Sequence, residues 1–152
     1  MTPIQGPLAL RAMRHQNSRD RGDNFYSPAW HTRWIKAGIL NAECERCGDR
    51  LPNWNCTCGI YGTFDLLTAR TYQMISPNSS AIFLVEATGR WLLYTKGWRA
   101  AQAVIHAIVL PKAVDVLSPA GLTAHYAATY FNRRLISTET ALEAIKLQQQ
   151  RV

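Results

Sequence analysis

The stretch 42-AECERCGDRLPNWNCTCGIYG-62 contains every cysteine of this 152-residue chain. The four thiols, Cys44, Cys47, Cys56 and Cys58, follow the spacing C-x2-C-x8-C-x-C. Closely spaced cysteine pairs are typical of metal ligands, whereas disulfides need an oxidising compartment that nothing in the sequence indicates. We therefore expect the four thiolates to bind one metal ion within a single loop, called here the cysteine loop (residues 44–58).

The residues between and after the cysteines favour zinc. Four zinc–sulfur bonds of about 2.3 Å place the sulfurs only about 3.8 Å apart, so each pair must come from a tight turn. A glycine follows the second cysteine of each pair, Gly48 and Gly59, and glycine permits the positive φ that such a turn needs. We expect Pro52 to turn the chain and Trp54 to cover one side of the site. An iron–sulfur centre and chance clustering are the alternatives.

The ligand set predicts a structural metal, not a catalytic one. A catalytic zinc keeps one coordination position open beside three protein ligands, whereas four cysteines fill the shell. The signature of the zinc deaminases is absent, because no His-x-Glu occurs in the chain. We therefore expect Zn²⁺ to stabilise the fold.

Length and composition predict one folded domain over residues 1–152, since 47% of the residues are apolar and 18% are charged. No apolar run is long enough to cross a bilayer, and the first residues lack a signal-peptide pattern. These features predict a cytoplasmic protein with no membrane contact. The net charge of +7, about +5 with a four-thiolate zinc site, is compatible with nucleic acid as a partner and equally with a basic surface of no special role.

The hydrophobic pattern predicts strands in the first two thirds of the chain. Residues 8–14 favour a short strand, and the polar residues 15–28 favour a loop. A short helix is expected after the cysteine loop, capped by Thr63 and stopped by Pro77. Three apolar runs, separated by Gly89 and Gly97, predict an antiparallel meander over residues 81–87, 90–95 and 103–110.

The last third favours two helices. Ser118 and Pro119 open the first, which is expected to run to about Phe131. Ser137 or Thr138 opens the second, with an apolar stripe of Leu142, Ile145 and Leu147. The order of elements predicts an α+β fold: a small antiparallel sheet with a zinc-knuckle loop and C-terminal helices. The core is expected at about residues 8–112 and the helical segment at about 118–150.

No catalytic motif is legible in the sequence. The histidines fall outside known metal and catalytic patterns, and no G-x-S-x-G or phosphate-binding glycine loop occurs. For His106, in a predicted strand, and His125, in a predicted helix, packing roles are expected. An enzyme is therefore the less favoured hypothesis.

Two clusters of basic and aromatic residues are candidates for binding a partner. Aromatic side chains beside arginines on a sheet stack bases while the cations meet phosphates. The competing interpretation places the tryptophans in the core, with cations that only extend to solvent; it is favoured for Trp91 and left open for Trp98. The candidate residues are Arg90, Lys96, Trp98 and Arg99 on the predicted strands, and Arg133 and Arg134 after a predicted helix.

Several short segments resemble a group of small uncharacterised proteins of actinobacteria and their phages. The matching segments are Ala42-Glu43-Cys44, Cys56-Thr57-Cys58-Gly59-Ile60-Tyr61, Gly89-Arg90 and Gly97-Trp98-Arg99-Ala100. The resemblance covers roughly residues 8–112 and implies a zinc-binding α+β module without bringing an activity. In that group a second ligand, often His, stands between the first Cys and the C-x-C pair; here Cys47 takes its place, closer to the first ligand.

These observations predict a small intracellular binding or adaptor protein with a structural zinc site. The resemblance favours a phage or mobile-element origin and a host factor as target. The alternative is a nucleic-acid-binding protein that uses the basic and aromatic sheet surface.

Overall fold

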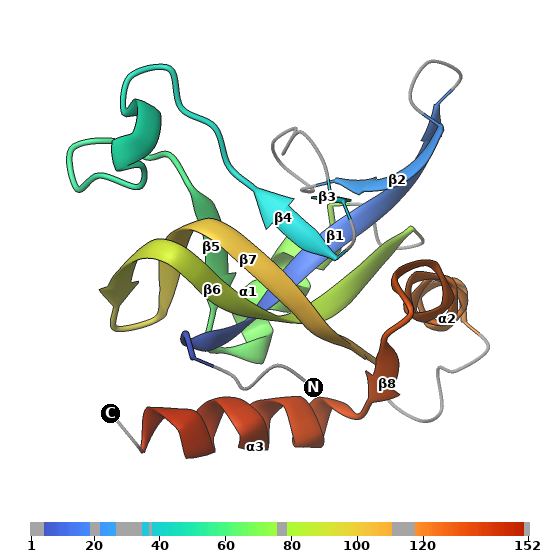
Figure 1. Cartoon of the computed structure of the whole chain (residues 1–152). Helices are drawn as coiled ribbons and strands as arrows, with labels where there is room; N and C mark the ends of the chain where they lie inside the picture. Colours follow the sequence, from blue (N-terminus) through green and yellow to red (C-terminus); the bar gives the residue numbers. More distant parts are fainter. Residues whose placement is uncertain are drawn as a thin grey trace.

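The computed structural model describes residues 5–18, 22–26, 35–36, 38–75, 79–110 and 118–150. Within these ranges eight strands form one sheet and three α-helices pack around it (Figure 1). The predicted α+β class, with a mainly antiparallel sheet and C-terminal helices, is confirmed. The elements are β1 (Leu8–Ser18), β2 (Gly22–Tyr26), β3 (Ile35–Lys36), β4 (Ile39–Asn41), the 3-10 turn η1 (Gly48–Arg50), β5 (Ile60–Thr63), α1 (Leu66–Gln73), β6 (Ser80–Tyr94), β7 (Gly97–Val109), α2 (Pro119–Phe131), β8 (Arg134–Ile136) and α3 (Thr138–Gln149).

The centre of the sheet is the long antiparallel hairpin β6–β7. The sequence predicted three strands here, with a turn at Gly89, and that prediction is wrong. Gly89 has a φ of +68° inside β6, and the register against β7 shifts between Thr88 and Trp91. Its positive φ therefore produces a bulge that bends one continuous strand instead of a turn between two.

The predicted loop over residues 15–28 is also wrong in its described part. β1 continues through Ser18 and pairs with β2, with His15 opposite Phe25. Phe25 is fully buried and packs its ring near those of Phe83 and Phe131. Most residues of this hairpin are polar, so the pattern of alternating apolar residues that identifies most strands is missing from its sequence.

Four strands form a closed circuit of pairings: β1 pairs with β5 and β6, and β7 pairs with the same two strands. Trp98, Phe83 and Met13 are buried in one continuous core with other residues of this circuit. One side of helix α2 covers the same core through Ala124, Ala127 and Phe131. As predicted, Ser118 caps α2 and Pro119 is its first residue.

Helices α1 and α3 cover a second apolar cluster on the other side of β1, β6 and β7. Ala69 of α1 and Ala141 and Ile145 of α3 pack there against strand residues. The predicted α3 stripe is confirmed at Ile145 but not at Leu147, which is 47% exposed. In addition, the side-chain amide of Gln148 donates to the carbonyl of Gly6 and accepts from the N–H of Leu8.

The start of α1 differs from the prediction. The helix is capped by Asp65, whose carboxylate accepts from the N–H of Thr68, while Thr63 belongs to β5. Leu67 and Met74 are exposed to solvent, and Ala69 is the buried residue of the helix. Pro77, the predicted stop, lies outside the described residues.

Within the described ranges, no helix has both the length and the apolar character needed to cross a membrane. β8 adds the single parallel pairing of the sheet's described strands, against β7. The cysteine loop projects from the end of the sheet where β6 turns into β7, and α2 lies at the opposite end (Figure 1).

Candidate metal centre

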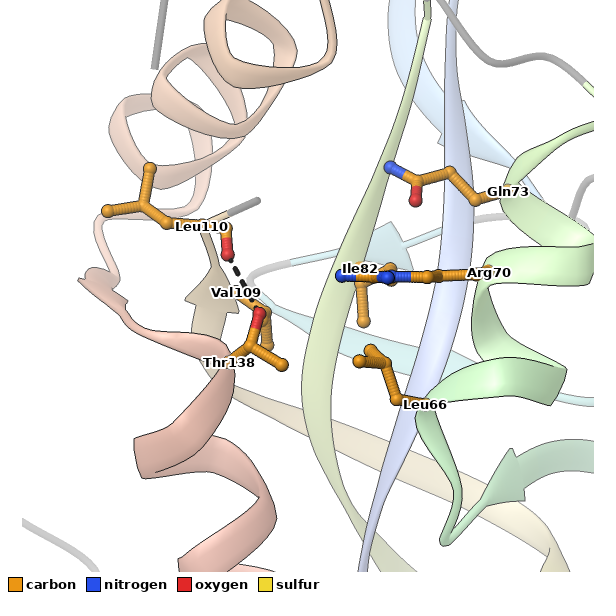
Figure 2. A pocket seen from close by; sticks show the side chains of 7 residues that line it. All are labelled: Leu66, Arg70, Gln73, Ile82, Val109, Leu110 and Thr138. Carbon is orange, nitrogen blue, oxygen red and sulfur yellow. Dashed lines mark hydrogen bonds between the residues drawn. The ribbon is translucent and has the colours of Figure 1, made fainter. Parts of the chain in front are cut away.

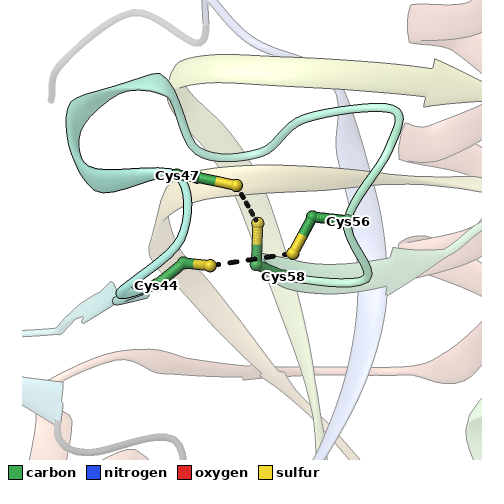
Figure 3. Close-up of side chains that lie close together, drawn as sticks. All are labelled: Cys44, Cys47, Cys56 and Cys58. Atoms are coloured by element: carbon green, nitrogen blue, oxygen red, sulfur yellow. Dashed lines mark hydrogen bonds between the residues drawn. The ribbon is translucent and has the colours of Figure 1, made fainter.

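The four cysteine sulfurs converge between the two turns of the cysteine loop (Figure 3). The Sγ atoms of Cys44 and Cys56 are 3.7 Å apart, and those of Cys47 and Cys58 are 3.5 Å apart. All four sulfurs lie within 4.8 Å of one another. Four tetrahedral bonds of about 2.3 Å require sulfur separations of about 3.8 Å, so the arrangement fits one divalent ion at its centre.

The two glycines adopt the conformation that the sequence predicted. Gly48 has a φ of +52° and Gly59 a φ of +110°. A Cβ on Gly59 would lie 3.2 Å from both the carbonyl of Ala100 and the side chain of Pro52, so this turn also needs a residue without a side chain for space. Pro52 is buried at the base of the loop.

The pKa values of the thiols differ because backbone hydrogen bonds and removal from water affect them unequally. A hydrogen bond from the backbone N–H of Cys47 lowers the pKa of Cys44 to about 7. Removal from water, together with the neighbouring thiols, raises the pKa of Cys47 to about 12 and also raises the pKa of Cys58. Four thiolates at these distances repel one another, and a divalent cation between them removes that repulsion.

A buried arginine connects the cysteine loop to the sheet. Arg99 of β7 is 4% exposed. Its guanidinium donates to the carbonyls of Cys56, Cys58 (3.0 Å) and Asn53 (3.1 Å). Its Nε donates to the hydroxyl of Tyr94 at 2.7 Å. Arg99 therefore satisfies three carbonyls of the loop and places a positive charge beside the predicted thiolate site.

A second arginine and two aromatic residues also contribute to the contact between the cysteine loop and the β6–β7 hairpin. Arg90 donates from Nε to the carbonyl of Pro52 at 3.1 Å. Trp54, expected to cover one side of the site, is 61% exposed and meets the ring of Tyr94 edge-on, with 5.2 Å between centroids. The loop is thus fixed to the β6–β7 hairpin at Pro52 and at residues that follow it.

The predicted partner-binding residues divide into buried and exposed ones. Trp98 is 1% exposed in the core and Arg99 is bound to the loop, so neither side chain is available to a partner, and their prediction as binding residues is corrected. Trp98 is large and lies against Gly62, where any side chain would collide with its ring. Conversely Trp91 of β6, predicted for the core, is 40% exposed.

The remaining cationic candidates lie in different places. Lys96 is exposed in the turn between β6 and β7. Arg133 is half-buried and donates to the carbonyls of Ile105 and Phe131, so it closes the end of α2. Arg134 is exposed on β8. The structure does not bring Arg133 and Arg134 together with the β6–β7 hairpin tip, since β8 pairs with the opposite end of β7.

The histidines in the predicted strand and helix have no common site. His106 forms a 2.6 Å contact between its Nε2 and the carboxylate of Glu86, which also accepts from the N–H groups of Gln5 and Gly6. This confirms the predicted packing role of His106. His125 is exposed on α2, so its predicted packing role is not seen.

A small cavity lies between α1 and the start of α3 (Figure 2). Its volume of about 30 Å³ holds about one water molecule. Arg70 and Gln73 reach it from α1, and Thr138 lines the other side (Figure 2). The cavity is too small for a metabolite-sized substrate.

The chain matches none of the protein families, curated proteins or solved structures with which it was compared. Its function is therefore argued from the metal centre and the surface that this centre supports.

Proposed function

We propose that this chain is a small intracellular binding or adaptor protein whose recognition loop is held in shape by one structural zinc ion. The observation that carries the proposal is the convergence of four cysteine sulfurs within 4.8 Å of one another on two glycine-assisted turns. A shell of four protein sulfurs leaves zinc no open position for a substrate or an activated water. The metal then has a structural role only: it fixes the conformation of the cysteine loop.

The proposed metal is Zn²⁺, bound by Cys44, Cys47, Cys56 and Cys58. Purified protein is expected to contain about one zinc per chain by elemental analysis. An iron–sulfur centre would instead give a coloured protein with iron and inorganic sulfide. A protein that folds with neither metal, and whose thermal stability does not change with a chelator, would contradict the proposal.

Binding is favoured over catalysis by what the loop presents to solvent. Trp54 and Tyr61 are 61% and 48% exposed, and Tyr94 is 39% exposed beside them. Exposed large aromatic residues on a rigid support are typical of recognition surfaces. The described cavity of about 30 Å³ is at the other side of the sheet and offers no comparable site.

The role as an adaptor from a phage or mobile element, acting on a host factor, rests on the resemblance to the small actinobacterial and phage proteins. A tagged protein recovered from a bacterial lysate is expected to bring down one stoichiometric partner. The same experiment with Trp54→Ala is the control, because this change removes an exposed ring and leaves the zinc ligands in place.

A further inference from the structure

The surface around the cysteine loop combines exposed aromatic side chains with cations and lacks carboxylates in its two main segments. Residues 51–64 and 87–110 supply the second half of the loop, β5, the end of β6 and β7. These segments contain Arg90, Lys96 and Arg99 but no Asp or Glu. A negatively charged partner that approaches over these segments meets no carboxylate from either of them, and the loop's exposed acidic residues, Glu45 and Asp49, lie in its first half.

Three exposed aromatic residues, called here the aromatic face, lie near the tip of the β6–β7 hairpin, two of them against the buried guanidinium of Arg99: Trp54, Tyr61 and Tyr94. The carbon Cζ of Arg99 is 5.8 Å from the ring centroid of Tyr61 and 5.5 Å from that of Tyr94. Trp54 meets Tyr94 at 74° between ring planes. The three rings come from the cysteine loop, β5 and β6; Arg99 contacts the two tyrosines, and Trp54 contacts Tyr94.

The polar ends of the two tyrosines are already engaged by the protein. The hydroxyl of Tyr61 donates to the carbonyl of Thr57 at 2.6 Å, and the hydroxyl of Tyr94 accepts from Arg99. These bonds fix the rings before any partner arrives, so binding does not have to order them. What remains free for a partner is ring surface, the chemistry that stacks on nucleobases irrespective of their sequence.

We propose that the aromatic face binds single-stranded nucleic acid, with bases stacked on Trp54, Tyr61 and Tyr94 and the phosphates near Arg90 and Lys96. This inference rests on the proposed zinc-supported binding function and names its partner class. It uses a different set of residues from the sequence-based candidates, because Trp98 and Arg99 are buried and act only as support. Single strands are favoured over duplexes because base stacking needs unpaired bases.

The test measures fluorescence anisotropy of a labelled oligothymidine of about 12 nucleotides with the zinc-loaded protein. Trp54→Ala is expected to weaken binding about tenfold or more, since one base–aromatic stack contributes that much. The matched control is Trp91→Ala, which removes another exposed tryptophan from the same hairpin. Trp91 and Tyr94 are three residues apart on β6, so they lie on opposite faces of the strand, and the control is expected to bind as the wild type does.

Salt provides a second measurement. Each phosphate contact in a single strand contributes about −0.7 to the slope of log affinity against log salt. Lys96→Gln is expected to reduce that slope by about 0.7, and Lys146→Gln, an exposed lysine on α3, is expected to leave it unchanged.

The outcomes separate this inference from the proposed function. Weakening by Trp54→Ala but not by Trp91→Ala supports the aromatic face. No binding at low salt, equal loss in both variants, or equal affinity for a duplex of the same length overturns it, and the surface then belongs to a protein partner. Zinc content, measured on the same samples, decides the proposed function independently.

Discussion

The cysteine loop and the strand circuit β1–β6–β7–β5 are stabilised by different forces. The circuit buries Trp98, Phe83 and their neighbours in a continuous apolar core. In η1 of the cysteine loop no residue is buried, and the loop depends on four thiols, two glycines and hydrogen bonds from arginine. Many apolar contacts stabilise the strand circuit, so the loss of one leaves the others in place. The cysteine loop depends on a few specific groups, and no neighbouring residue can take over the role of one that is lost.

Removal of the metal should cause the largest loss of stability, because structural zinc contributes about 10 kcal/mol or more to the folding of the region it holds. A chelator, or Cys58→Ser, is expected to open residues 44–58 while β6 and β7 stay folded. Hydrogen exchange should show fast exchange in the loop and continued protection of the hairpin. Thr57→Ala, between two ligands, is the matched control and should keep the metal. Simultaneous loss of protection in both regions would show that they fold as one unit.

A substitution in the apolar core should lower the stability of the sheet without preventing zinc binding. Trp98→Ala is expected to lower the free energy of unfolding by about 3–5 kcal/mol, since it removes the largest fully buried side chain among the described residues. The folded fraction should still bind zinc. Trp91→Ala, at 40% exposure, is the control and should change stability by less than about 1 kcal/mol. Denaturant unfolding measures both, and equal effects would contradict the different placement of the two tryptophans.

Arg99 belongs to both regions, so its replacement tests the connection between them. Arg99→Met leaves the carbonyls of Asn53, Cys56 and Cys58 without their donor, and we expect a loss of about 2–3 kcal/mol. Zinc affinity should fall together with stability. Arg99→Lys keeps the charge but not the planar fork, so it should recover only part of both. Wild-type zinc affinity in Arg99→Met would show that the loop forms without the sheet.

The smallest predicted effect is the pH dependence of the stability that Glu86 contributes, and Glu86 lies outside the metal centre. Burial opposes ionisation of Glu86, but hydrogen bonds from Gly6, His106 and Gln5 outweigh it, so the pKa of Glu86 is lowered. The pKa of Glu86 is therefore lower in the folded state than in the unfolded state. The ionised carboxylate stabilises the fold above the unfolded-state pKa of about 4.3, and this stabilisation is lost as the pH falls through the folded-state pKa. The stability difference between wild type and Glu86→Gln, about 1 kcal/mol near neutral pH, should therefore shrink in acid. A constant difference would contradict the assignment.

The features predicted correctly from the sequence depend on residues close together in the chain. Ser118 caps α2 through the N–H of Gly121, three residues away. Gly48 and Gly59 each follow a cysteine, and their positive φ angles serve turns of a few residues. Capping and turn formation are local, so short motifs identify them.

The features that were missed depend on distant partners. Arg99 bonds to carbonyls more than 40 residues earlier, and nothing in the neighbouring sequence distinguishes it from an arginine exposed to a partner. Trp91 and Trp98 are similar in sequence context, and their burial depends on the packing of Trp98 against Gly62 of β5. Gly89 produces a bulge instead of a turn because β7 continues alongside it.

The hydrogen bonds of the Gln148 amide bear on the order in which the chain can fold during translation. The amide bonds to backbone atoms of Gly6 and Leu8, about 140 residues earlier, and β1 also needs its neighbour β6. On the ribosome the first strand therefore emerges long before either partner exists. Its apolar residues Leu8 and Leu10 share their cluster with α1, β6, β7 and α3, so this cluster is complete only after the last helix has left the exit tunnel. A chain that stops before Gln148 would keep the metal ligands and the pairing of β1 with β6, but it would lose the amide that holds the backbone of Gly6 and Leu8.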